Sequence, residues 1–248
     1  MNAQATRPSS CWSFLVPISH EVDSLTVPPS TVTQPPRISR GELVRKAVHM
    51  SPGLIAFLMS PIPHYDPLAW HEVGIIAGVI AVMIGIFLYL KATVQRDDED
   101  NFLSTTFSYG ICVLVMSAVF RGNPEFVCIV VAVLAFGDGS AYLAGKLWGR
   151  RKLPWNRSKS WVGSIAFILV SAPMAALAFW LEARPTAPFS LAFACAASAA
   201  VAGSLAESLP MKLTDNLRVG VAASIACVAA YFAFAPVLFP NGPAVQLF

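Results

Sequence analysis

The sequence is short of charged residues. Only 12% of its 248 residues are Asp, Glu, Lys or Arg, whereas soluble domains carry about 25%. Hydrophobic residues make up 56% of the chain. This imbalance excludes an ordinary soluble domain and indicates an integral membrane protein that crosses the bilayer several times.

The sequence also lacks the common signatures of thiolate metal sites and nucleotide-binding loops. No two cysteines form a CxxC pair, and the four in apolar runs are interpreted as packing residues: Cys112, Cys128, Cys195 and Cys227. The chain has no GxxxxGK[ST] loop, and Gly137-Asp138-Gly139 lacks the third glycine of a dinucleotide-binding motif. Any nucleotide site must therefore be built differently.

Pro, Ser and Thr are frequent in residues 1–40, which contain few large apolar side chains. Such a segment buries too little surface to offset its ordering entropy, so we expect a disordered cytoplasmic tail. It shows no compact apolar stretch typical of a secretory signal, and Glu21 and Asp23 argue against a transit peptide.

Seven apolar segments follow this tail. They lie at 44–62, 72–90, 102–120, 124–146, 161–182, 188–208 and 217–239. Each is close to the roughly 20 residues that cross about 30 Å of hydrocarbon as a helix. The sequence therefore predicts an all-α fold, with one transmembrane domain over 41–248 built as a bundle of about seven helices.

Positive charge is divided unevenly between the two sides of this bundle. If the N-terminus is cytoplasmic, 15 of the 17 Lys and Arg residues fall in cytoplasmic segments, which leaves Arg121 and Arg184 on the other side. The positive-inside rule therefore predicts a cytoplasmic N-terminus and motif loops that face the cytoplasm. We expect a bacterial-type inner membrane, with an organelle membrane as the alternative.

One carboxylate, Asp138, interrupts an apolar run. An acid in a membrane helix costs about 2.5–3.5 kcal/mol on insertion scales, so it is usually retained for function. Tyr142, Gly145 and Gly149 follow at helical spacing and share its face. The structural alternative is a buried aspartate that only pairs with a neighbouring cation.

Six Lys and Arg residues lie between Lys146 and Lys159, just before a helix expected to start at Trp161. Free N–H groups at a helix start attract phosphate, and nearby lysines strengthen that attraction. The candidate phosphate-binding residues are Gly145, Lys146, Lys159, Ser160 and Gly163. Alternatively, the loop contacts anionic lipid head groups.

Acids and an amide near the C-terminal end of the sixth segment form a candidate metal site. Glu207, Asp215 and Asn216 offer hard oxygen ligands that suit Mg²⁺, and Asp138 could complete the set around a metal–triphosphate. Arg45, Lys46 and His49 lie at the start of the first segment. They are candidate catalytic residues, or they serve only as a positive-inside anchor.

Two other polar clusters are interpreted as structural. The acids in 95–101 are typical of a solvated loop. His64 and His71, near Asp66 and Glu72, are interpreted as histidines at the opposite membrane interface, although a metal site there is conceivable.

Together, these motifs resemble the polyprenol kinase family, which includes phytol, farnesol and dolichol kinases and the CTP-dependent diacylglycerol kinase. The resemblance covers residues from about 41 to 235, and "KLPWNRSKSWVGSIA" at 152–166 is most similar to the phytol kinase branch. The matching residues are Arg45-Lys46-x-x-His49, Gly137-Asp138 with Gly145 and Gly149, Lys159-Ser160-x-x-Gly163, and Glu207 with Asp215-Asn216.

The resemblance implies a multispanning enzyme that transfers the γ-phosphate of a nucleoside triphosphate, usually CTP, to a lipid hydroxyl. By the same resemblance, Arg45, Lys46, Asp138 and Gly145 match positions that the family needs, and Mg²⁺ is the implied metal. The expected partners are the nucleotide and a membrane alcohol: phytol, another prenol or diacylglycerol. No nucleic acid is expected, and ATP remains open as the donor.

Two other functions compete with this one. Residues 138–149 also fit the D-x-x-A-Y-x-x-G-x-x-x-G pattern of phosphatidate cytidylyltransferases, but 200–248 contain neither His nor Gly-Gly, which their closing signature requires. A transporter would place charges near the membrane midplane and often show inverted repeats. Here the motifs gather on one side and no repeat is visible, which favours the kinase.

Overall fold

The structure is a computed structural model that describes residues 38–64, 66–90, 102–211 and 213–242. These residues belong to one compact unit, Pro35–Phe248. Nearly all of the predicted tail, and the acidic cluster at 95–101, lie outside the described residues. The described part is helical and contains no strand, as the sequence predicts; its one isolated β-bridge joins Lys152 to Ser160.

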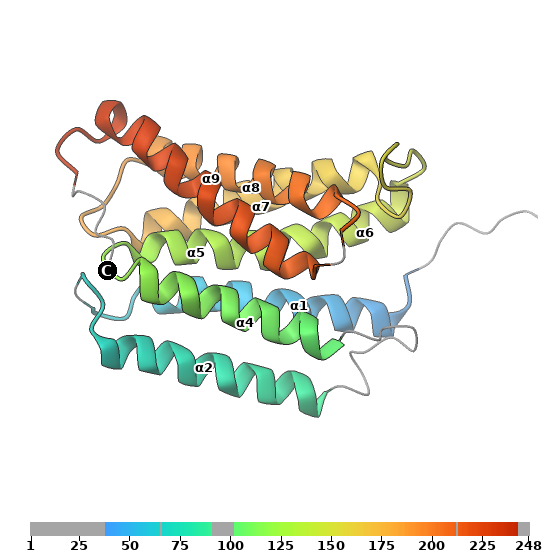
Figure 1. Ribbon diagram of the computed structural model, residues 1–248, viewed down its shortest axis with the longest axis horizontal. Coiled ribbons are helices and arrows are strands. Elements are labelled where there is room, and N and C mark those ends of the chain that lie inside the picture. The colour runs from blue at the N-terminus through green and yellow to red at the C-terminus, as the bar shows by residue number, and fades with distance from the viewer. Residues whose placement is uncertain (1–37, 65, 91–101, 212, 243–248) are drawn as a thin grey trace, which may run out of the picture. The chain divides into compact units, whose positions relative to one another are not determined.

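Helices occupy all seven predicted positions (Figure 1). They are α1 (Arg40–Met59), α2 (Trp70–Tyr89), α4 (Phe102–Val119), the continuous run α5 (Pro124–Ala132), η1 (Val133–Gly137) and α6 (Asp138–Trp148), then α7 (Trp161–Glu182), α8 (Phe189–Ser208) and α9 (Asp215–Leu238). Among the described residues, five of these segments are long and apolar enough to cross a membrane: α2, α5–η1–α6, α7, α8 and α9.

Helices α1 and α4 do not meet the criteria of length and composition for a span, so the count of seven spans stays a prediction. Helix α1 carries four charged residues in its first seven positions, so its apolar part begins only after Lys46. Within the described residues, the apolar stretch of α4 is Thr106–Val119, which is shorter than a typical span.

The α5–η1 segment forms the centre of the bundle. Every residue from Phe126 to Phe136 is at most 9% exposed, since helices α1, α4, α7, α8 and α9 surround it. A helix that is hydrophobic on all sides is stable only when enclosed in this way. The five-residue π-helix η1 then widens the turn immediately before Asp138, a feature that often marks functional sites.

Small residues allow the C-terminal helices to approach closely. Helix α8 packs along α7 and α9 (Figure 1), and its buried face is built from residues that include Ala192, Ala196, Ala199, Ala200 and Gly203. Membrane helices pack mainly through such small side chains, because lipid supplies no hydrophobic force between them.

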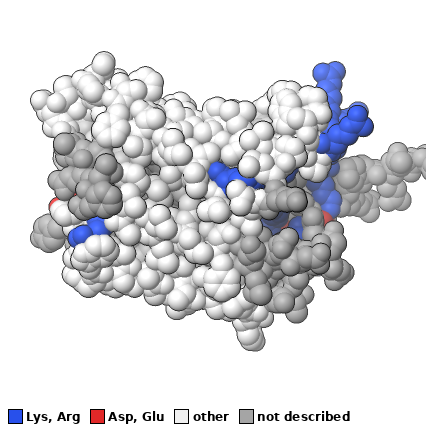
Figure 2. Space-filling view, viewed as in Figure 1, with Lys and Arg blue, Asp and Glu red and all other residues white. Residues whose placement is uncertain are grey.

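The polar motifs gather at one end of the bundle, where α1, α7 and α9 begin and where α6 and α8 end (Figure 1). We call this the basic end and the opposite one the far end. Figure 2 shows most of the visible Lys and Arg at the end that carries the α6–α7 loop, and a broad uncharged surface across the helices. A belt of this kind suits contact with lipid.

Candidate functional site

Asp138 lies at the start of α6, directly after the π-helix, and faces α1. Lys46 donates a 2.7 Å hydrogen bond to Asp138 Oδ2, and His49 Nε2 lies 3.2 Å from the same oxygen. Lys46 and His49 are three residues apart, so both project from one face of α1. The fold therefore brings Lys46 and His49, predicted as candidate catalytic residues, together with Asp138, the acid predicted to lie in the membrane.

Glycines on both sides of Asp138 allow this close approach. A Cβ atom at Gly137 would overlap the ring of Phe167, and one at Gly139 would overlap the side chain of Met50. Glycine at both positions lets side chains of α7 and α1 pack tightly on either side of the acid. The Gly137-Asp138-Gly139 sequence is thus a packing requirement around the carboxylate.

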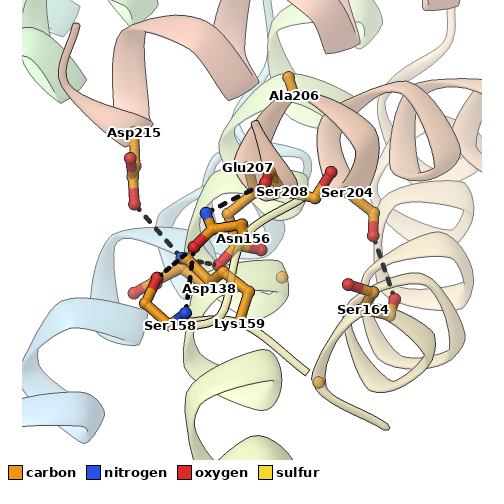
Figure 3. A network of polar contacts seen from close by, with 12 residues as sticks. Asp138, Asn156, Ser158, Lys159, Ser164, Ser204, Ala206, Glu207, Ser208 and Asp215 are labelled. Carbon is orange, nitrogen blue, oxygen red and sulfur yellow. Dashed lines mark hydrogen bonds and ion pairs between the residues drawn. The ribbon is translucent and has the colours of Figure 1, made fainter. Parts of the chain in front are cut away.

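A second charged group surrounds Lys159, which comes from the α6–α7 loop (Figure 3). Its ammonium lies 2.5 Å from Glu207 Oε1, at the end of α8, and 3.3 Å from Asp215 Oδ2, at the start of α9. Arg218 also pairs with Asp215. Three predicted site residues therefore meet, although they come from three separate segments.

The charge of Lys159 is held by these acids. Burial disfavours the ammonium, but the carboxylates of Glu207 and Asp215 outweigh that effect and raise the pKa of Lys159 above its ordinary value. Lys159 therefore remains a cation, as phosphate binding requires. Asn216, which is predicted to bind metal together with Asp138, Glu207 and Asp215, is buried in the first turn of α9.

Lys146 pairs with a carboxylate of α1, and the phosphate contact predicted for it stays a prediction. Its ammonium contacts both carboxylate oxygens of Glu42, on α1, and the hydroxyl of Tyr142 donates a 2.6 Å hydrogen bond to the same carboxylate. Hydrogen bonds from Lys146, Tyr142 and the Ser39 backbone lower the pKa of Glu42 to about 2. Sequence reasoning missed Glu42; its spacing from Ser39, typical of a capping box, was the available signal.

Ser160, Gly145 and Gly163 form the junction between α6 and α7. Ser160 is buried, and its hydroxyl accepts a 3.2 Å hydrogen bond from the Gly163 N–H as the cap of α7. A Cβ atom at Gly163 would lie 2.9 Å from the Ala141 carbonyl, and one at Gly145 would lie 3.1 Å from the Ser160 hydroxyl. These residues thus hold two helices in contact and fix where the α7 N-terminus lies.

Arg45 lies beside the Asp138 group without joining its ion pairs. Its guanidinium is 5.5 Å from the centre of the Tyr142 ring, a cation–π distance. Its Nε atom is buried and has no hydrogen-bond partner among the described residues. A buried donor without a partner is costly, so this atom is suited to receive a ligand acceptor.

An apolar cavity of about 890 Å³ opens beside Asp138 and runs between α1, α2, α4 and α5. At the basic end Arg45, Lys46, His49 and Asp138 line it, and its middle is lined by aliphatic side chains such as Ile55, Ile80 and Val113. No sequence pattern predicts this cavity, because its walls are mainly four helices and its ends also include residues of α6, α7 and α9.

A smaller pocket of about 450 Å³ lies at the basic end. Lys159, Glu207, Asp215 and Arg218 line it, and Asp215 also lines the apolar cavity. A polar pocket and an apolar one therefore share a wall near the Asp138 group. Such a junction can bring a water-soluble anion to the polar end of a lipid.

The residues present are compatible with a magnesium–phosphate complex. Among the described residues, no three Asp, Glu, His or Cys side chains converge as a ready metal site. Mg²⁺ in phosphate-transfer sites, however, commonly takes only one or two carboxylates, with substrate phosphates and waters as the other ligands. Glu207 and Asp215, on either side of Lys159, meet that smaller requirement.

Comparison with known proteins gives a consistent group of relatives. A family model described as the cytidylyltransferase family matches residues 38–212. A phytol kinase from Synechocystis is 33% identical over 141 residues, which are 54% of this chain and 57% of that protein. A probable chloroplastic phytol kinase 1 from Oryza sativa is 26% identical over 215 residues, 80% of this chain and 66% of the relative.

A chloroplastic farnesol kinase from Arabidopsis thaliana is 25% identical over 200 residues, 75% of this chain and 64% of the relative. The chain thus spans about three fifths of the length of the relatives it matches. No solved structure matches it.

Proposed function

The chain belongs to the cytidylyltransferase family, and because similar proteins are named phytol and farnesol kinases, we propose that it is a membrane kinase for isoprenoid alcohols. In this proposal it transfers the γ-phosphate of a nucleoside triphosphate, with CTP as the preferred donor over ATP, to the hydroxyl of phytol or another prenol. Diacylglycerol is the alternative acceptor.

One observation carries the proposal. The Asp138–Lys46–His49 group lies at the polar end of a cavity otherwise suited to a hydrocarbon chain, and the polar pocket of Lys159, Glu207, Asp215 and Arg218 adjoins it. An isoprenoid tail would fill the apolar cavity and present its hydroxyl at Asp138. The triphosphate would reach the same point from the polar pocket.

The reaction requires one bond to form and one to break. The alcohol oxygen attacks the γ-phosphorus, the bond from that phosphorus to the β–γ bridging oxygen breaks, and the alcohol loses its proton. We assign Asp138 to orient the hydroxyl and accept this proton, since it lies at the polar end of the cavity with Lys46 and His49 both at its Oδ2 atom. Phosphoryl transfer depends mostly on such positioning and on neutralising phosphate charge.

Lys159, Arg45 and the metal are all assigned to the nucleotide. Lys159 and Arg45 would bind phosphate oxygens, since Lys159 lines the polar pocket and the Arg45 Nε has no protein partner in the described part of the chain. Glu207 and Asp215, with Asn216 next in sequence, would hold Mg²⁺. A bound Mg²⁺ would supply further neutralisation of the phosphate charge.

Lys146 is assigned to positioning. Its pairing with Glu42 ties α6 to α1, and thereby holds Asp138 against Lys46. Ser160, Gly145 and Gly163 would contribute through the α7 N-terminus that they place near the loop. Its free N–H groups favour a phosphate.

Labelled nucleotides test the reaction type directly. Purified protein in detergent or liposomes would receive CTP or ATP, labelled in either the α- or the γ-phosphate, with farnesol, phytol, diacylglycerol or phosphatidate. We expect γ-label, and no α-label, in a prenol monophosphate, with CTP as the better donor. Transfer of α-label to phosphatidate would identify a cytidylyltransferase, and no lipid label with any pair would favour the transporter alternative.

A further inference from the structure

The apolar cavity ends in a second polar group at the far end of the bundle. His64 and Glu182 both line the cavity there, and their side chains are 9% and 7% exposed. His64 Nε2 lies 3.4 Å from Glu182 Oε1 and 3.9 Å from Asp66 Oδ1. We call His64, Asp66 and Glu182 the polar floor.

The polar floor is poorly satisfied by the protein. Both carboxylate oxygens of Asp66 and the Oε2 atom of Glu182 are buried without a hydrogen-bond partner among the described residues. The nearby Arg184 donates instead to backbone carbonyls, at 2.8 Å to Ser60 and 2.9 Å to Leu181. The Glu182 oxygen, which faces the cavity, therefore needs water or another polar group there, because an unpaired buried carboxylate is strongly unfavourable.

The distance between the two polar ends is about the length of a moderate isoprenoid tail. Asp138 and Pro124 both line the cavity and are 14 residues apart on the continuous α5–η1–α6 run, or about 20 Å at 1.5 Å per residue. A fully extended phytyl chain is comparable to this span. A polyprenol many isoprene units longer exceeds it.

We propose that His64 and Glu182 set the upper limit of tail length that this protein accepts. A tail that stops short of the polar floor leaves room for water or another polar group beside these oxygens. A longer tail would put hydrocarbon against the unpartnered Oε2 atom of Glu182 and exclude any other polar partner from it. The inference rests on the proposed function in taking the cavity as the site of a prenol tail, and it adds a specificity determinant at the end remote from the chemistry.

Tail binding can be measured separately from phosphoryl transfer. A fluorescent farnesol analogue bound to the full-length, detergent-purified protein would be displaced by farnesol, phytol or a long polyprenol. We expect farnesol and phytol to agree within about threefold and the long polyprenol to bind at least about tenfold more weakly, as loss of polar contacts at the floor requires. Equal binding of phytol and the long polyprenol would overturn the inference and indicate that tails leave sideways between helices.

Two variants of the polar floor are compared. One removes the His64–Glu182 pair, and the other is its control. His64→Leu with Glu182→Leu removes both members of the pair that lines the cavity, which is tolerated better than removal of one; Asp66, which does not line the cavity, is kept. It should bring the long polyprenol within about threefold of phytol, as a floor without this pair no longer repels hydrocarbon. Glu182→Gln keeps a polar side chain of similar size and should retain the wild-type discrimination. An unchanged discrimination in the double variant would contradict the proposal.

A third variant shortens the cavity without disturbing the floor. Ile75 lines the cavity near the start of α2 and is 59% exposed, so Ile75→Trp has room for a larger side chain. It should weaken phytol relative to farnesol by about tenfold, a difference of 1.4 kcal/mol. An unchanged ratio would place the tail outside this cavity. This variant and the wild-type profile decide the matter if the double variant does not fold.

These outcomes separate the inference from the kinase assignment. Displacement needs no nucleotide, so a length limit without any lipid phosphate would count against the kinase alone. Prenol phosphorylation without a length limit would count against the polar floor alone. Absence of displacement by every prenol would reject the inference.

Discussion

At the scale of single residues, the site depends on which charges are partnered. Asp138 has a lysine and a histidine at one oxygen, whereas Lys159 is shared by two acids, Glu207 and Asp215, that are 48 and 56 residues from it in sequence. The sequence motifs identified Asp138 and Lys159 as site residues. Which residue pairs with which depends on how the helices pack against one another, so these ion pairs could not be predicted from sequence spacing.

Replacing Asp138 by Asn keeps the shape of the side chain and removes its charge. We expect prenol kinase activity to fall by about a hundredfold or more, which is the usual contribution of a positioned acid–base group. Membrane insertion should be unchanged. Initial rates at saturating nucleotide, normalised to the amount of folded protein, measure this.

Glu125→Gln is the control, since Glu125 is another carboxylate of the same helical run, here buried, and lies at the start of α5, near the far end. It should keep most of the activity. Asp138→Asn activity within threefold of wild type would leave Asp138 with the structural role of an ion-pair partner.

Lys159→Ala distinguishes a phosphate ligand from a topology signal. Loss of a charge-assisted contact of about 1.5–3 kcal/mol should raise the nucleotide KM or lower kcat about tenfold or more, with little change in the KM for the alcohol. Lys152→Ala, in the same loop but exposed, is the control and should be nearly silent. Steady-state kinetics of both variants in one membrane preparation decide between the roles; equal, small effects would move the phosphate site elsewhere.

At the scale of elements, the hydrophobic runs predicted all seven helix positions, because apolar segments of this length are stable in a bilayer only as helices. The π-helix ahead of Asp138 was not predictable, since its residues are as apolar as those of the α-helix before it. The pairing of Lys146 with Glu42 was likewise missed, because the contact between α1 and α6 joins residues 104 positions apart.

Glu42 links the start of α1 to α6, and its ionisation should therefore influence stability. Its pKa is lowered from an ordinary value near 4.5 to about 2, so the ionised form stabilises the fold. This contribution is complete above about pH 4.5 and is lost as the pH falls toward 2. At pH 7 we expect Glu42→Gln to lower the Tm in detergent by about 2–4 °C, with a smaller difference from wild type at each step below pH 4.5.

Glu72→Gln is the control for this measurement, because Glu72 also caps a helix start, accepting a 2.6 Å hydrogen bond from the Ala69 N–H on α2. Its effect reports loss of a cap without loss of the α1–α6 link. A Glu42→Gln difference that stays constant from pH 7 down to pH 3 would show that the charge of Glu42 does not stabilise the fold.

At the scale of the whole molecule, the proposed function requires a particular orientation in the membrane. The polar pocket around Lys159 must open to the compartment that holds the nucleotide, while the polar floor lies toward the other side. The uneven distribution of Lys and Arg predicts that the basic end faces the cytoplasm. The positive charge of the loops therefore sets the orientation, and the orientation decides whether the nucleotide can reach the Lys159 pocket.

Cysteine labelling in intact cells tests this orientation. Lys152 lies in the α6–α7 loop and Thr186 lies between α7 and α8, and both are exposed. In a Cys11→Ser background, where the described remaining cysteines are buried, a membrane-impermeant maleimide should label Thr186→Cys directly and Lys152→Cys only after permeabilisation. The reverse pattern would put the Lys159 pocket on the side without CTP, and the kinase assignment would then need a different nucleotide site or a different function.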